Sequence, residues 1–216
     1  DLNRNLEFRK AIKHAIDGKA FAKAMSKGPF VSVYAGGIAR DSAFFDADAT
    51  SFFPYNPAGA NALLDGLGLM DTDGNGIRNL ANGGGDLVIN LVQNKDSENE
   101  KLIGDGLATM MAEVGIKLNL KPMEDTEPTR QSGEWDWAIS RAQQEFAFPN
   151  SGYWSEMGPV TTSSFDPHMG SDEHPQQFQP FEKEIVSILE QWRDGVEGAE
   201  AQALMSRYQK LFTENV

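Results

Sequence analysis

The chain has 216 residues, enough for one large or two small domains with a hydrophobic core. Its 19 basic and 32 acidic side chains give a net charge of -13, which argues against nucleic acid or an anionic membrane surface as a partner. There is no cysteine, which excludes disulfides, thiol nucleophiles and cysteine metal sites.

Two helices are expected at the start of the chain. Asn5 or Asn3 can cap the first helix, and apolar side chains recur at helical spacing as far as Ile16. Asp17 follows as the cap of a second, shorter helix. That helix is expected to end at Gly28, because glycine is a natural C-terminal stop.

An irregular stretch and a third helix come next. Residues 29–55 contain prolines, glycines and many aromatic side chains without periodicity, which indicates a loop. Asn56 is a good cap and Pro57 suits the first helical position, so a helix is predicted to run to Leu67. The segment 71–86 is rich in turn residues.

The middle of the chain alternates between strands and helices. A continuous apolar-rich run at 87–92 predicts a buried strand. Ser97 and Glu100 are expected to form a capping box that opens a helix to about Val114. Further elements follow in this order: a strand at 116–120, a short helix or loop at 125–132 and a strand at 135–140. Such an alternation with short links favours a parallel α/β unit.

The last third of the chain is expected to hold a long irregular stretch and two helices. Residues 141–180 carry five prolines among polar and aromatic side chains. A loop of this length in a compact domain is usually functional or covers another domain. The closing helices are predicted at 181–194 and 199–213.

Four stretches, in order along the chain, resemble a known protein family. They are Arg9 to Gly28 with Ala11 and Ala15-Ile16-Asp17; Tyr55-Asn56-Pro57 with Ala62-Leu63-Leu64, Gly68 and Asp71-Thr72-Asp73-Gly74-Asn75-Gly76; the strand at 87–92 with Gly115-Ile116; and Gly133-Glu134-Trp135-Asp136. This pattern is similar to that of the family 5 extracellular solute-binding proteins, the dipeptide- and oligopeptide-type receptors of ABC importers. The matching stretches span about residues 6 to 140.

The resemblance implies a type II periplasmic binding protein, whose two α/β lobes close on a ligand. In that family the first stretch lies roughly halfway along the mature chain. Residues 1–216 are therefore expected to be a C-terminal lobe, with the N-terminal lobe missing. The resemblance also implies a binding protein and not an enzyme, no cofactor, a periplasmic or extracytoplasmic location, and a membrane permease as partner.

The strand ends at Val92 and Ser140 are where an α/β sheet is expected to bind a small-molecule or short-peptide ligand. Arg141, Gln143 and Glu145 follow the second strand. Relatives that bind peptides place an acidic residue just past this strand, to pair with the ligand's α-amino group, and Glu145 is the nearest candidate here. A glutamate preceded by an arginine departs from the family pattern of a stretch that ends in aspartate. Amino-acid-derived and opine-like solutes therefore stay open beside peptides, with oligosaccharides less favoured. The alternative for Arg141 and Glu145 is a surface ion pair.

Three further residues are candidates for ligand contact. Tyr153 and Trp154 suit the wall of a cleft, or else they pin the long loop to the core. Asn94 follows the strand at 87–92 close to the helix start at Ser97, where free amides favour an anion. A simple helix cap is the alternative for this last position.

Asp71, Asp73 and Asn75 copy the first half of a calcium loop. A full loop needs an acidic ligand at its twelfth position, which is occupied by Asn82. The same residue types also form ordinary turns. A calcium-dependent interaction module, and a small hydrolase with acidic catalytic residues, are the two alternative functions.

Overall fold

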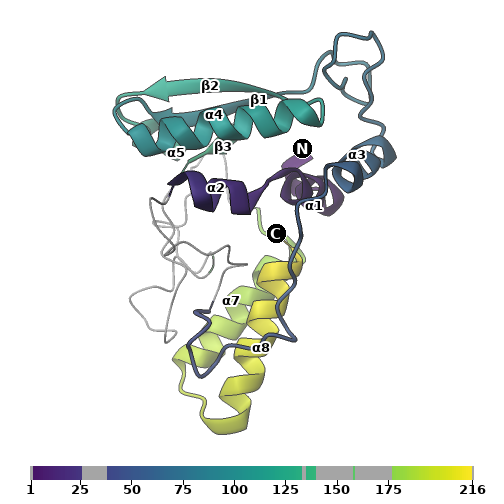
Figure 1. Cartoon of the computed structure of the whole chain (residues 1–216). Coiled ribbons are helices and arrows are strands. Elements are labelled where there is room, and N and C mark those ends of the chain that lie inside the picture. The colour runs from purple at the N-terminus through teal and green to yellow at the C-terminus, as the bar shows by residue number, and fades with distance from the viewer. Residues whose placement is uncertain (1, 26–37, 133–134, 140–157, 159–176, 216) are drawn as a thin grey trace.

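The computed structural model describes residues 2–25, 38–132, 135–139, 158 and 177–215, which form an α/β unit and a helical pair beside it (Figure 1). The elements of the α/β unit are η1 (Leu2–Arg4), α1 (Leu6–Ala15), α2 (Gly18–Met25), α3 (Pro57–Gly66), β1 (Val88–Asn94), α4 (Glu98–Glu113), β2 (Lys117–Met123), α5 (Glu127–Ser132) and β3 (Trp137–Ala138). The helical pair consists of α7 (Pro180–Arg193) and α8 (Gly198–Glu214). None of the helices in these ranges combines the length and apolar character needed to cross a membrane.

Side-chain caps fix the starts of the first helices as the sequence predicts. The Asn5 Oδ1 accepts hydrogen bonds from the amides of Glu7 and Phe8, which settles the first cap on Asn5. The Asp17 Oδ1 accepts from the amides of Lys19 and Ala20 at 3.1 and 3.0 Å. The predicted end of α2 at Gly28 lies outside the described residues.

The predicted capping box at the start of α4 is half wrong. The Ser97 Oγ accepts from the Glu100 amide at 3.3 Å, but the Glu100 carboxylate accepts from the Asn94 amide at 2.6 Å. Alternate amides of the central strand β1 face β3, and β3 ends opposite Val92. In the part of the chain that the structure describes, the Asn94 amide therefore has no strand partner on that side, and it donates its hydrogen bond to the Glu100 carboxylate.

The sheet is parallel, as the alternation of elements predicts, with strand order β2-β1-β3. β1 and β2 pair from Val88 opposite Lys117 to Asn94 opposite Met123. The strand expected at 135–140 is shorter than predicted, because β3 covers only Trp137–Ala138. The Asp136 carboxylate accepts from the Asn90 amide at 2.8 Å in place of a strand carbonyl. A hydrogen bond to a side chain therefore replaces the backbone ladder at this position.

The described residues bury two separate hydrophobic cores. The first lies among α1, α3, α4 and the sheet, with Phe8, Ala11, Leu64, Ile89, Met111 and Ile116 among its members. The second joins α7 and α8 to the irregular segment after residue 38, with Ile38, Ile185, Leu189, Met205 and Tyr208 among its members. That residues 1–216 form a single lobe stays a prediction.

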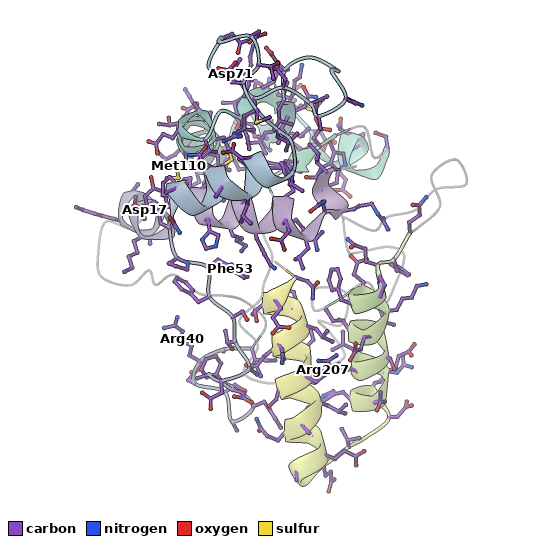
Figure 2. All side chains as sticks on the ribbon, turned by 90° about the vertical axis from the view of Figure 1, so that its right-hand side faces the viewer. Asp17, Arg40, Phe53, Asp71, Met110 and Arg207 are labelled. Atoms are coloured by element: carbon purple, nitrogen blue, oxygen red, sulfur yellow. The ribbon has the colours of Figure 1, made fainter. Side chains whose placement is uncertain are left out.

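Polar contacts attach the start of α2 to α4, and the segment after residue 38 to α8. The Asp17 amide lies 3.3 Å from the Met110 Sδ, which holds the start of α2 against α4 (Figure 2). In the helical pair, the fully buried Gln209 accepts from the Asp46 amide at 3.1 Å and donates to the Phe44 carbonyl at 2.8 Å. The irregular segment is thereby bonded along α8.

Candidate functional site

The three strands end on one side of the sheet, because all of them are parallel; the arrowhead of β2 marks this edge in Figure 1. The Ile139 amide donates to the Val92 carbonyl at 3.1 Å. Residue 139, the last described residue of this stretch, therefore lies beside the central strand, at the edge where α/β sheets bind ligands. The predicted contact residues Arg141, Gln143, Glu145, Tyr153 and Trp154 all lie outside the described residues.

Asn94 is the one predicted ligand residue that the structure describes. Its Oδ1 accepts from the Asp96 amide at 2.8 Å, and its own amide donates to Glu100. The Glu100 carboxylate also places negative charge at the start of α4, where an anionic ligand would otherwise be favoured. These contacts favour a local structural role for Asn94 over ligand contact, although Ser97 and not Asn94 is the cap of α4.

The turn at 71–76 satisfies its own polar groups. The Asp71 carboxylate accepts from the amides of Gly74 and Gly76 at 2.7 and 2.9 Å, and the Asp73 Oδ1 accepts from the Asn75 amide at 3.1 Å. These backbone bonds, led by that of Gly76, lower the pKa of Asp71 against the opposing effect of desolvation. Within the described ranges no cluster of three or more acidic or histidine side chains could hold a metal ion.

The turn also lies away from the expected ligand edge. It precedes β1, and Figure 2 shows Asp71 at the far end of the α/β unit from α7 and α8. Gly74 and Gly76 have φ values of 78° and 86°, which only glycine adopts at little cost. The geometry is that of a tight turn. A calcium loop would also have a glycine at its sixth position, so the argument against calcium rests on Asn82 at the twelfth position.

A row of polar side chains crosses the three strands, a feature that the sequence analysis did not single out. The Asn119 Nδ2 donates to the Asn90 Oδ1 at 2.9 Å, and the Asn90 Nδ2 donates to the Asp136 carboxylate at 2.9 Å. The sequence signal is an asparagine at the centre of each of two apolar strands, on the same face by register. The row holds the start of β3 against the central strand.

Solved structures of binding proteins share this fold. The periplasmic binding protein MelB from Agrobacterium fabrum C58, in complex with stachyose, is 31% identical with a TM-score of 0.86, over 99% of this chain and 33% of that one. The mannohexaose-bound oligopeptide-binding protein of Thermotoga maritima is 17% identical with a TM-score of 0.78, over 98% of this chain and 40% of that one. The second likeness concerns the fold alone. The chain thus has the fold of the type II periplasmic binding proteins, as predicted.

The family is shown by sequence. The model of the bacterial extracellular solute-binding proteins, family 5 (middle region), matches residues 2–163, and the chain belongs to this family. The curated periplasmic alpha-galactoside-binding protein of Rhizobium meliloti (strain 1021) is 34% identical over 223 residues, which cover 100% of this chain and 32% of that protein. The chain therefore spans about a third of the length of these relatives. Membership confirms the predicted resemblance and supports a binding protein over an enzyme.

Proposed function

We propose that this chain is part of the substrate-binding component of an ABC importer and that it binds a solute outside the cytoplasm. Membership in a family described as extracellular solute-binding proteins carries this proposal. Its partners are a membrane permease, to which the solute is delivered, and a second lobe in the same polypeptide. The fraction of each relative that the chain covers supports this second lobe.

The solute class that we propose is an oligosaccharide of the α-galactoside type. The two relatives described above with more than 30% identity support this choice, since one is named for alpha-galactosides and the other holds stachyose. The sequence analysis preferred peptides, amino-acid-derived compounds and opine-like compounds, and ranked oligosaccharides last. The departure of Arg141 and Glu145 from the peptide-receptor pattern agrees with a solute other than a peptide.

The proposed mechanism is lobe closure around the sugar at the carboxyl edge of the sheet. Tyr153 and Trp154 supply apolar faces on which sugar rings stack, while Arg141, Gln143 and Glu145 hydrogen-bond to the hydroxyl groups. In the described part of this edge, the central strand β1 has a neighbouring strand on each side, which gives the proposed site a rigid support. No bond of the solute is broken in this mechanism.

Calorimetric titration of the complete polypeptide with stachyose tests the proposal. We expect a dissociation constant of about 1 μM or tighter, with no heat from cellotetraose or tetra-alanine. Recovery of unchanged stachyose after incubation separates binding from hydrolysis. Binding of tetra-alanine without stachyose would refute the sugar proposal, and release of free galactose would favour the hydrolase alternative.

A single substitution tests the aromatic contact. Trp154→Ala should weaken stachyose binding about tenfold or more, because buried aromatic anchors carry much of a site's affinity. Tyr55→Ala is the control, since Tyr55 is an exposed aromatic residue whose hydroxyl donates to Glu113 at 3.0 Å. Equal affinities in the two variants would remove Trp154 from the site.

A further inference from the structure

Arg9 of α1 contacts both helices of the helical pair. Its Nε donates to the Asn215 carbonyl at 2.8 Å, at the C-terminal end of α8, where the helix dipole favours a cation. Its guanidinium carbon lies 5.6 Å from the centre of the Phe181 ring in α7, within cation–π range. Partial burial lowers the pKa of Arg9, and the nearby charge of Glu182 opposes that effect.

Hydrogen bonds also link Arg9 to the sheet by way of Asn3. The Arg9 Nη1 donates to the Asn3 carbonyl at 3.0 Å. The Asn3 side chain accepts from the Trp137 Nε1 at 2.9 Å and donates to the Asp136 carbonyl at 3.4 Å. Since the Asp136 carboxylate bonds to Asn90 of the central strand, hydrogen bonds run unbroken from α8 to β1.

This hydrogen-bond network contacts the chain on both sides of the connection between β3 and α7. Asn3 holds the residues at the start of β3, and the Arg4 Nη1 donates to the Gln177 carbonyl at 3.1 Å, three residues before α7. The elements on the two sides pack against different hydrophobic cores: Trp137 of β3 against the first and Phe181 of α7 against the second. The relative position of these ends is therefore set largely by the segment from Asn3 to Arg9.

We propose that Asn3, Arg4 and Arg9 form a positioning clamp, which joins the helical pair to the α/β unit and fixes the two ends of the β3–α7 connection. Arg9 is the centre of the clamp, since it alone contacts η1, α7 and α8. Arg4 is exposed and contributes less. The clamp also gives a physical role to Arg9 and Asp136, two of the residues on which the family resemblance rests.

The consequence for solute binding rests on the proposed function. The candidate ligand residues Arg141 to Trp154 fall within the connection whose ends the clamp fixes. Misplacing a binding group by about 1 Å is enough to weaken a site strongly. Arg9 touches no solute in this proposal and acts only through the position of the connection.

Hydrogen exchange of the chain at 1–216 tests the clamp without any ligand. In Arg9→Gln we expect the amides of α7 and α8 to exchange about tenfold faster or more, because a charge-assisted bond and a ring contact are lost. The amides of β1 should stay within about twofold of the wild type, since sub-global opening spares the other core. Lys10→Gln is the matched control: Lys10 neighbours Arg9 in α1, and its side chain forms an ion pair with Glu7 at 2.9 Å.

Arg9→Lys keeps the charge and loses the planar donor fork, so its α7 and α8 amides should exchange at intermediate rates. If Arg9→Gln does not fold, the exchange rates of Arg9→Lys are compared with those of Lys10→Gln instead, and equal rates refute the clamp. The clamp is refuted if Arg9→Gln matches Lys10→Gln, or if β1 amides accelerate as much as those of α7, which would indicate general destabilisation.

Stachyose titration of the complete polypeptide then tests the link to binding. Arg9→Gln should weaken affinity about tenfold and Lys10→Gln should not. Failure of the wild type to bind stachyose counts against the proposed function and leaves the exchange result standing. Unchanged affinity in Arg9→Gln, with faster exchange in α7 and α8, would refute the positioning role.

Discussion

Arg78 joins several separate parts of the α/β unit through one buried side chain. It is 8% exposed, and its Nε donates to the Val114 carbonyl at 2.7 Å, at the end of α4. Its Nη1 pairs with Asp65 at 2.6 Å and also donates to the Leu69 carbonyl, while its Nη2 donates to Asn61 at 2.6 Å. Every nitrogen of this guanidinium has a partner, and the cost of burying the charge is offset by these bonds.

We expect Arg78→Gln to lower the free energy of unfolding by about 3 kcal/mol, because buried carbonyls lose their donors. Arg207→Gln removes an exposed ion pair with Glu184 and should cost about 1 kcal/mol or less. Urea denaturation of both variants measures the difference. Equal losses would mean that Arg78 is not the structural centre we describe.

Asp71 should make stability depend on pH at the acid end. Hydrogen bonds from Gly76 and Gly74 lower the pKa of Asp71 in the folded state below the unfolded value of about 3.9. A depressed carboxyl pKa stabilises the fold above the unfolded pKa, and this contribution is lost as the pH falls through the folded pKa. The wild type should therefore exceed Asp71→Asn in stability at pH 6, and this difference should shrink as the pH falls below about 4.

Denaturant unfolding of both proteins across that range measures this difference. A difference in stability that stays constant down to pH 2 would show that the charge of Asp71 makes no contribution. Calcium gives a second readout at the same residue. If the carboxylate is held by its own turn, added Ca²⁺ should leave the melting temperature unchanged, and a clear rise would revive the calcium interpretation.

At the scale of elements, α4 packs against the sheet with Gly104 facing Gln93 of β1. A Cβ on Gly104 would lie 2.0 Å from the Gln93 Oε1, a buried oxygen that has no hydrogen-bond partner among the described residues. Glycine inside a helix normally costs about 1 kcal/mol relative to alanine. The buried Gln93 side chain occupies the place of that Cβ, so an alanine at position 104 would have to displace it.

Gly104→Ala is expected to destabilise the protein by about 1–3 kcal/mol through overpacking. Gly66→Ala in α3 is the matched control, because a Cβ there meets nothing within 4 Å, and it should stabilise by up to about 1 kcal/mol. In thermal unfolding the two variants should shift in opposite directions. Adding Gln93→Ala should reduce the cost of Gly104→Ala, and additive effects would contradict the proposed contact.

At the scale of the whole molecule, the helical pair projects from the α/β unit with its own core (Figures 1 and 2). If the second lobe supplies half of the solute contacts, the chain at 1–216 should bind stachyose at least about 100-fold more weakly than the complete polypeptide. The reason is that affinity falls tenfold for every 1.4 kcal/mol of contact energy lost. Parallel titrations of the two proteins measure this ratio, and equal affinities would show that one lobe holds the whole site.

The sequence by itself determined most of the elements. Asn5, Asp17, Asn56 and Ser97 begin helices as predicted, because a cap acts through bonds to amides two or three residues away. The alternation of apolar strands and capped helices likewise determined a parallel sheet. Local chemistry decides such features, and a sequence displays it directly. The ligand residues at 141–154 were chosen from the same reasoning and stay predictions.

Only the tertiary structure decided which distant groups meet. The Glu100 carboxylate bonds to Asn94 and not to its own helix cap, because β3 ends early and leaves that amide without a strand partner among the described residues. Arg9 meets Asn215, 206 residues away, and no local pattern encodes such a pairing. The division into two cores depends in the same way on contacts between distant segments. Long-range packing sets these partners, and periodicity and spacing report only on near neighbours.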